Sequence, residues 1–183
     1  MATYIESGLC LNLPDGQHFR FADLPAYQAL KGQHLKEMDF AWVSQGTLFL
    51  LEVRSYAQIT EILTGADFLP TQGQSSPHRY QVLIDKVTDS LLMMLAAWAN
   101  SSLGQSLKFF LPVEAMARLP LKLVIAVDLP ANLVVHLQAL KDSLNERLRG
   151  RLALADVRNV VVIDYARLVT NPMFCGLIKI QSH

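Results

Sequence analysis

The sequence predicts a single mixed α/β domain spanning residues 1–183, in which helices flank a mixed β-sheet that follows an N-terminal hairpin. Three observations support this fold class. The chain has 183 residues, of which 51% are hydrophobic, so it is long enough to bury a core of its own. Its first third is rich in short strand-like runs bounded by turn residues. The remainder alternates helical and continuous apolar segments, as α/β folds do.

Two β-hairpins are predicted in the first 55 residues. Residues 9–13 and 17–21 flank Pro14-Asp15-Gly16, a favourable turn sequence because proline fixes one dihedral and glycine tolerates positive φ. Residues 36–43 and 48–55 flank a second turn and are rich in Phe, Trp, Val and Leu, which suit a buried sheet. A possible helix follows over 57–63.

A long core helix is expected over 78–100. Ser76 is a candidate N-cap and Pro77 a candidate first helical residue, and the apolar residues beyond them recur at intervals of three or four. The stretch 91–99 holds nine apolar residues, whereas about 20 are needed to span a bilayer, so no membrane partner is expected.

The last part of the chain predicts a β-α-β crossover. Residues 121–127 and 160–163 are continuous apolar runs typical of buried parallel strands. Residues 133–148 between them show helical spacing, with Gly150 as the expected stop. Residues 177–180 are expected to add an edge strand.

Composition restricts the function classes and the setting. Lys plus Arg number 16 and Asp plus Glu number 16, so the chain lacks the basic excess of a protein that coats nucleic acid. Only 17% of residues are charged, which leads us to expect a homo-oligomer or a protein partner. Cys10 and Cys175 match no metal or disulfide spacing, and the N-terminus resembles no secretory signal. Both features favour a cytoplasmic location.

The register of the second hairpin singles out two carboxylates. Centring the turn on Gln45 and Gly46 makes one face wholly apolar, with Met38 opposite Val53, Phe40 opposite Leu51 and Trp42 opposite Phe49. The other face turns ionic at one end, where Asp39 lies opposite Glu52 and Glu37 lies opposite Arg54. Such a pair has Cβ atoms about 5 Å apart and is unfavourable unless compensated. A hard divalent cation such as Mg²⁺ would compensate it. The alternative is a paired ionic patch formed by Glu37, Asp39, Glu52 and Arg54.

Met38-Asp39-Phe40 on one predicted strand is followed by Leu50-Leu51-Glu52-Val53-Arg54-Ser55-Tyr56 on the next. This pattern resembles the PD-(D/E)xK nuclease superfamily, whose signature is an Asp on one strand, a hairpin of about a dozen residues, then Glu-x-Lys on the next strand and a helix. The resemblance implies a restriction-endonuclease-like core and a metal-dependent phosphodiesterase that acts on nucleic acid.

The resemblance also implies roles for individual residues. Asp39 and Glu52 would bind Mg²⁺ or Mn²⁺, with the Val53 carbonyl as a third ligand. Arg54 takes the lysine position, and a guanidinium cannot act as a base at neutral pH, although it can hold a phosphate oxygen. Glu6 or Glu37 would be the additional acidic residue of the superfamily.

A lysine from a neighbouring element could replace the missing one. Lys86 on the long helix is the candidate, and the alternative for it is a solvated helix face with a Lys86 to Asp89 pair. Lys36 is a second candidate, although its strand parity directs it away from Asp39 and favours a surface position.

Two other interpretations stay open at the level of sequence. The chain could be a catalytically inactive module with a nuclease fold that oligomerises or binds a partner, as Arg54 suggests. It could instead be an enzyme for a nucleotide or metabolite, with a pocket near Asp128 and Asp164 at the ends of two strands. A basic stretch formed by Lys141, Arg147, Arg149, Arg151 and Arg158 could contact phosphates or stabilise a helix end.

Overall fold

The computed structural model describes residues 1–30, 32–57, 59 and 62–181. It contains a five-stranded and a three-stranded sheet. The large sheet has the order β3 (His18–Phe19), β4 (Phe40–Ser44), β5 (Thr47–Ser55), β6 (Leu121–Asp128), β7 (Val160–Asp164). The small sheet has the order β1 (Ala2–Glu6), β2 (Leu9–Leu13), β8 (Ile178–Ile180). The predicted mixed α/β class is therefore correct.

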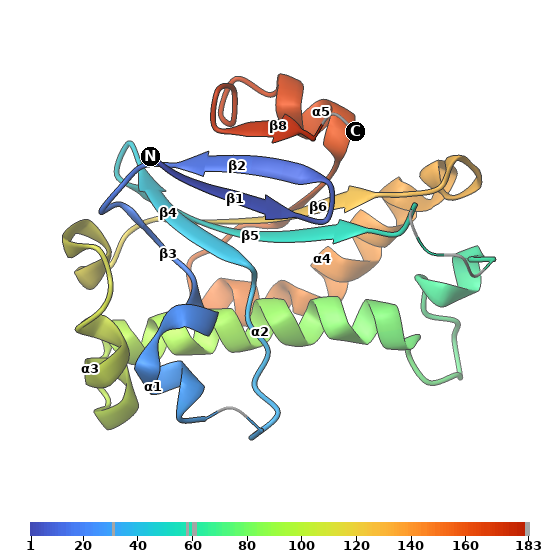
Figure 1. Cartoon of the computed structure of the whole chain (residues 1–183). Coiled ribbons are helices and arrows are strands. Elements are labelled where there is room, and N and C mark those ends of the chain that lie inside the picture. The colour runs from blue at the N-terminus through green and yellow to red at the C-terminus, as the bar shows by residue number, and fades with distance from the viewer. Residues whose placement is uncertain (31, 58, 60–61, 182–183) are drawn as a thin grey trace.

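The sheets and helices form layers. The helices are α1 (Pro25–Gln28), α2 (His78–Trp98), α3 (Ser102–Lys108), α4 (Leu137–Leu154) and α5 (Tyr165–Thr170). Helices α2 and α4 cover one face of the large sheet, and the small sheet lies over the opposite face (Figure 1). Each face of the large sheet thus has its own apolar core.

The second hairpin forms in the predicted register. Phe40 pairs with Leu51, Trp42 with Phe49 and Val43 with Leu48. Gln45 and Gly46 both have positive φ, 49° and 70°, as a two-residue hairpin turn with the correct twist requires. The ladder begins at Phe40, however, so Asp39 and Glu37 precede β4 instead of continuing it.

The predicted first hairpin is wrong in its pairing. Residues 9–13 and 18–19 are strands, but β2 pairs with β1 and β8, whereas β3 joins β4 in the large sheet. The physical reason is the turn at Ser7 and Gly8, whose φ angles of 49° and 84° make a tight hairpin between β1 and β2.

The parallel half of the sheet is confirmed. Strand β6 lies parallel to β5 on one side and to β7 on the other, and α4 connects β6 to β7. Residues 123–127 of β6 are buried on both faces, as their continuous apolar sequence predicts. The expected edge strand near 177–180 exists but belongs to the small sheet.

Several predicted helix boundaries need correction. Pro77 occupies the N-cap position of α2, which has no side-chain cap, so Ser76 does not cap the helix. Helix α4 passes through Gly150 and ends at Leu154, because the left-handed residue that stops it is Asp156, with φ 57°. The helix expected over 57–63 is absent from its described residues 57, 59, 62 and 63, while 58, 60 and 61 lie outside the description.

Candidate functional site

Lys86 joins the two carboxylates that the sequence singles out. Its Nζ atom lies 2.9 Å from Oδ1 of Asp39 and 2.8 Å from Oε2 of Glu52. The side chains are largely withdrawn from solvent, with exposed fractions of 11% for Lys86, 17% for Asp39 and 1% for Glu52. The expected Lys86 to Asp89 pair is therefore wrong: Lys86 is directed at the sheet, not along its own helix.

Arg54 completes the ionic network. Its Nε donates to Oε1 of Glu52 over 2.6 Å, and its side chain is 37% exposed. The expected pairing of Arg54 with Glu37 is wrong, because the chain before Phe40 leaves the ladder and Glu37 accepts a hydrogen bond from the Tyr27 hydroxyl. Two carboxylates and two cations thus neutralise one another at the end of β5.

Asp39 occupies its position through local backbone contacts. Its Oδ2 accepts a hydrogen bond from the Val53 amide N–H over 2.8 Å. This bond takes the place of a ladder bond just before the first residue of β4. The Asp39 carbonyl accepts a hydrogen bond from Nε of Arg20, whose guanidinium lies 4.9 Å from the centre of the Phe40 ring. Asp39 is consequently fixed both through its side chain and through its main chain.

Helix α2 holds the segment that leads into Asp39. Asp85 pairs with Nζ of Lys36 at 2.7 Å, and Asp89 accepts the Lys36 amide N–H at 2.9 Å. Ser90, which is fully buried, accepts the Met38 amide N–H at 2.8 Å. Residues 85, 86, 89 and 90 share one helical face, so a single surface of α2 positions both Lys86 and its carboxylate partner. Sequence reasoning missed Ser90, although its helical spacing from Lys86 is the signal that could have revealed it.

Burial dominates the electrostatics of Glu52. Desolvation, reinforced by the nearby Asp39 charge, raises the pKa of Glu52 to about 8, while Lys86 and Arg54 act in the opposite direction. Burial also raises the pKa of Tyr56, two residues further along, to about 12. Burial of the Glu52 carboxylate costs desolvation free energy, and the two nearby cations offset part of this cost.

The donor atoms at this site suit a hard divalent cation. Asp39 and Glu52 each direct one oxygen at the same point, where Lys86 now supplies positive charge. The Val53 carbonyl points to the same side of β5 as its N–H, which Asp39 accepts, so it faces this region too. Carboxylate and carbonyl oxygens are ligands that Mg²⁺ prefers. Within the described part of the chain, no three His, Cys, Asp or Glu side chains gather as a metal site, so the carbonyl would be essential.

Other predicted candidates lie elsewhere. Glu6 ends β1 in the small sheet, and Glu37 is held by Tyr27, so neither joins the carboxylate pair. Lys36 is half-exposed, as predicted, although it pairs with Asp85. The arginines of the basic stretch are exposed and Lys141 is partly buried. Arg151 lies in the last turn of α4, as stabilisation of a helix end predicts, whereas Lys141 lies well before it. Asp128 and Asp164 line a cavity, as the metabolite-enzyme interpretation predicts.

Comparison with known proteins gives no relative. No protein-family model, no curated protein and no solved structure matches this chain. No helix in the described ranges is long and apolar enough to cross a membrane. Any functional conclusion therefore depends on the geometry of the site itself.

Proposed function

We propose that this protein is a metal-dependent phosphodiesterase of the PD-(D/E)xK type that acts on nucleic acid. One observation carries the proposal: Lys86 Nζ lies within hydrogen-bond distance of both Asp39 and Glu52. The resemblance requires two carboxylates and a lysine, and α2 supplies the lysine that β5 lacks at Arg54. The order of elements, a hairpin, a long helix and a parallel crossover, is compatible with this core.

The residues have complementary roles in phosphodiester hydrolysis. A bound Mg²⁺ or Mn²⁺ would act as a Lewis acid on the phosphate and lower the pKa of a water molecule. Asp39, Glu52 and the Val53 carbonyl would hold it. Water oxygen attacks phosphorus, the P–O ester bond breaks, and the leaving oxygen takes a proton, which yields a phosphate monoester and an alcohol.

Lys86 and Arg54 supply hydrogen bonds to the reacting groups. An ammonium has three donors, of which Lys86 spends two on the carboxylates in this structure. A metal bound by these oxygens would take over that role and leave the ammonium to orient water or a phosphate oxygen. Arg54 uses Nε for Glu52, and its terminal nitrogens have no hydrogen-bond partner among the described residues, so they can hold a phosphate oxygen at the exposed end of the side chain. Both cations would stabilise the negative charge that develops on phosphorus.

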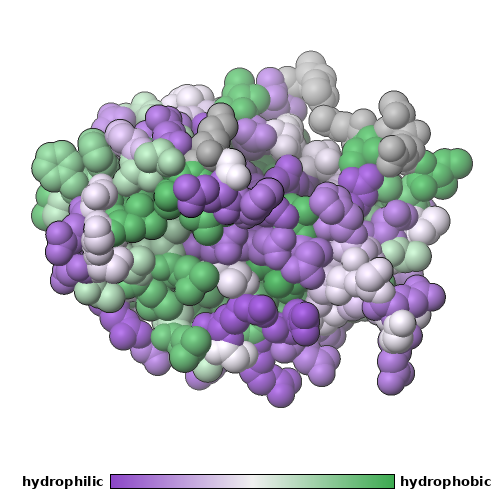
Figure 2. Space-filling view, turned by 90° about the horizontal axis from the view of Figure 1, so that it is seen from below, coloured by the Kyte–Doolittle hydropathy of each residue, from purple (hydrophilic) through white to green (hydrophobic). Residues whose placement is uncertain are grey.

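Two cationic side chains near the site could contact a phosphate backbone, and they lie beside the carboxylates of Asp85 and Asp89. Lys36 is half-exposed beside Asp85, and Arg151 of α4 is near enough to help lower the pKa of Asp85. In the view from below, hydrophilic side chains run across the middle of the helical face (Figure 2). Since the whole chain is neutral, these side chains would provide a local site and not a general affinity for nucleic acid.

Cleavage of labelled single- and double-stranded oligonucleotides with Mg²⁺ or Mn²⁺ tests the proposal. We expect Asp39→Asn, Glu52→Gln and Lys86→Met each to reduce the rate by about 100-fold or more, as loss of charge stabilisation does. Asp142→Asn, an exposed carboxylate on α4, is the matched control and should retain full activity. Thermal unfolding of each variant shows whether it is folded. Metal-dependent cleavage that persists in folded Asp39→Asn and Glu52→Gln proteins contradicts the proposal.

A second candidate is a nuclease-like module without turnover. Each oxygen of Asp39 and Glu52 already has a protein donor, namely Lys86, Arg54 or the Val53 amide. Such a network is complete without a metal. Calorimetric titration discriminates the two candidates, because this module predicts no binding of Mg²⁺ or Mn²⁺ at the pair, whereas the enzyme predicts binding that Asp39→Asn abolishes.

Oligomerisation and a cytoplasmic location stay predictions. Phe109 and Val113 are each 78% exposed, and Phe110 and Leu92 are also exposed. Apolar side chains gather on the side of the helical face where α3 lies (Figure 2). Exposed apolar residues of this kind are consistent with an interface, as the low fraction of charged residues suggests.

A further inference from the structure

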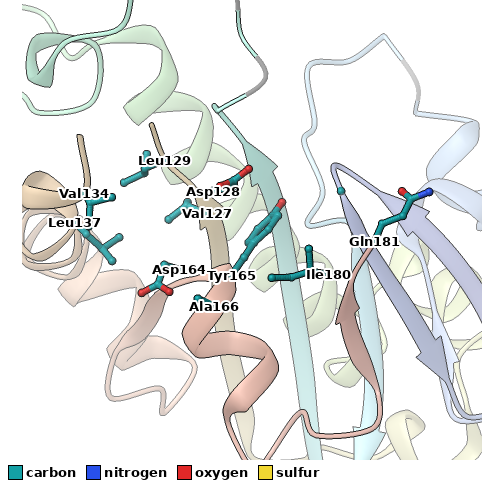
Figure 3. Close-up of a pocket in the computed structure, with 11 residues that line it drawn as sticks. Val127, Asp128, Leu129, Val134, Leu137, Asp164, Tyr165, Ala166, Ile180 and Gln181 are labelled. Atoms are coloured by element: carbon teal, nitrogen blue, oxygen red, sulfur yellow. The ribbon is translucent and has the colours of Figure 1, made fainter. Parts of the chain in front are cut away.

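A second candidate site lies at the carboxyl ends of β6 and β7. It is a cavity of about 290 Å³, lined by residues of β6, β7, α5, the start of α4 and the end of β8. Figure 3 shows Leu129, Val134 and Leu137 on one side and Tyr165 and Ile180 on the other, with the side chains of Asp128 and Asp164 between them. The cavity is thus an apolar cleft that contains two carboxylates.

The charged residues lining this cavity are all negative. Its described lining contains Asp128 and Asp164 but no lysine, arginine or histidine. Asp164 is largely committed, because it caps α5 through the Arg167 amide and pairs with the Arg167 side chain. Asp128 accepts one hydrogen bond through Oδ2, from the Ser55 hydroxyl at 2.8 Å. Among the described residues its Oδ1 has no donor, so Asp128 is the side chain with capacity for a ligand.

Around Tyr165 in the cavity wall, acidic groups outnumber basic ones three to one. Tyr165 lines the cavity, and its hydroxyl is already committed to the Ser7 carbonyl at 2.9 Å. Burial and then the nearby charges of Asp128, Asp39 and Glu6 raise the pKa of Tyr165, while the charge of Arg54 acts in the opposite direction. An anionic group entering the cavity would meet these carboxylates without a lining cation, whereas a cation would be attracted by them.

The walls determine what kind of cation fits. Leu129, Leu137 and Ile180 offer apolar surface, and the volume is sufficient for a chain of several carbons. We propose that the cavity binds a small organic cation, an ammonium or guanidinium group on a short apolar stem, with Asp128 as its anionic partner. This inference does not rest on the proposed phosphodiesterase function, because Asp128 is not among the groups proposed to hold the metal or the phosphate, and it is tested by binding.

The proposal is tested by titrating the full chain with n-butylguanidinium and with n-butylammonium and recording its NMR chemical shifts. We expect saturable shifts at residues of the cavity, and none with butyrate. Asp128→Asn should weaken binding at least tenfold, while Asp23→Asn, which removes an exposed charge elsewhere, should leave it unchanged. Ala166→Phe should also weaken binding, since Ala166 is exposed at the cavity wall and a larger side chain there fills the space without altering charge.

Three results would overturn the proposal. One is an absence of saturable shifts at the cavity for both cations. Another is equal affinity for neutral butanol, which would show that Asp128 does not select charge. The third is unchanged affinity in a folded Ala166→Phe protein, which keeps the test valid even if Asp128→Asn does not fold.

Discussion

Glu52 is the residue on which the site depends most. It is fully buried beside a second carboxylate, and two cations from different elements contact its two oxygens. Arg54 is therefore more than a replacement for the expected lysine, because it is the counterion of Glu52. Lys86 from α2 is the group placed between the carboxylates, so the two cationic roles are divided between β5 and α2.

The raised pKa of Glu52 makes stability depend on pH. The folded-state pKa is about 8 and the ordinary value is 4.5, so between these pH values the folded protein binds more protons than the unfolded chain. The contribution of Glu52 to the free energy of unfolding should therefore be largest below pH 4.5. This contribution should be lost as the pH rises towards 8. Urea unfolding across this range measures the effect.

Glu52→Gln should remove this part of the pH dependence, because an amide does not titrate. Glu146→Gln, at an exposed position of α4, is the matched control and should behave as the wild type does. A Glu52→Gln protein whose stability falls with pH as steeply as the wild type would show that Glu52 is not the titrating group.

Helix α2 is the element that assembles the site. Besides supplying Lys86, it binds the backbone of the segment before β4 through Asp89 and Ser90. This segment has no strand partner to fix it, since β4 begins only at Phe40. The position of Asp39 relative to Glu52 thus depends on helix contacts as much as on the sheet.

Ser90→Ala tests this arrangement. It leaves the buried Met38 N–H without its acceptor, which should cost about 1 to 3 kcal/mol of stability and reduce metal affinity and cleavage by loosening Asp39. Ser106→Ala, at an exposed position of α3, should change neither quantity. Unaltered metal affinity in Ser90→Ala would mean that α2 does not position Asp39 through Met38.

Replacing two helical glycines by alanine should have opposite effects on stability. A methyl group at Gly104 would lie 1.9 Å from the Ala96 carbonyl oxygen of α2, and neither backbone can yield easily, so Gly104→Ala should destabilise the protein by about 3 kcal/mol. Nothing lies within 4 Å of such a group at Gly150, inside α4, so Gly150→Ala should stabilise it by about 0.5 to 1 kcal/mol. Thermal unfolding of both variants gives the comparison, and equal effects would contradict the close approach of α3 to α2.

At the scale of the whole molecule, local sequence patterns predict where strands and helices lie better than they predict which strands pair. The second hairpin was predictable because alternating apolar residues flank a turn whose two residues tolerate positive φ. Strand β1 was not, because none of its residues is buried and its sequence Ala-Thr-Tyr-Ile-Glu does not alternate apolar with polar residues. Only the tight turn at Ser7 and Gly8 reveals it. For the same reason β2 was assigned to the wrong partner.

In the candidate site, too, local sequence predicts the residues, and tertiary packing decides how they meet. Asp39 and Glu52 could be paired from hairpin register alone, and Lys86 could be named as a candidate lysine. Whether Lys86 faces the sheet or solvent depends on how α2 packs across β4 and β5, which is set by contacts distant in sequence. The hairpin register also predicts a pair between Arg54 and Glu37. This pair is wrong because β4 begins only at Phe40, so the register does not reach Glu37.

The most direct test of the account is a crystal structure of the protein soaked in Mn²⁺, with anomalous scattering used to locate the metal. If the carboxylate pair is a metal site, a peak lies in contact with Asp39, Glu52 and the Val53 carbonyl, and none is present in Asp39→Asn crystals. Crystals that hold Mn²⁺ elsewhere but show Lys86 still bridging the two carboxylates, with no peak there, would contradict it.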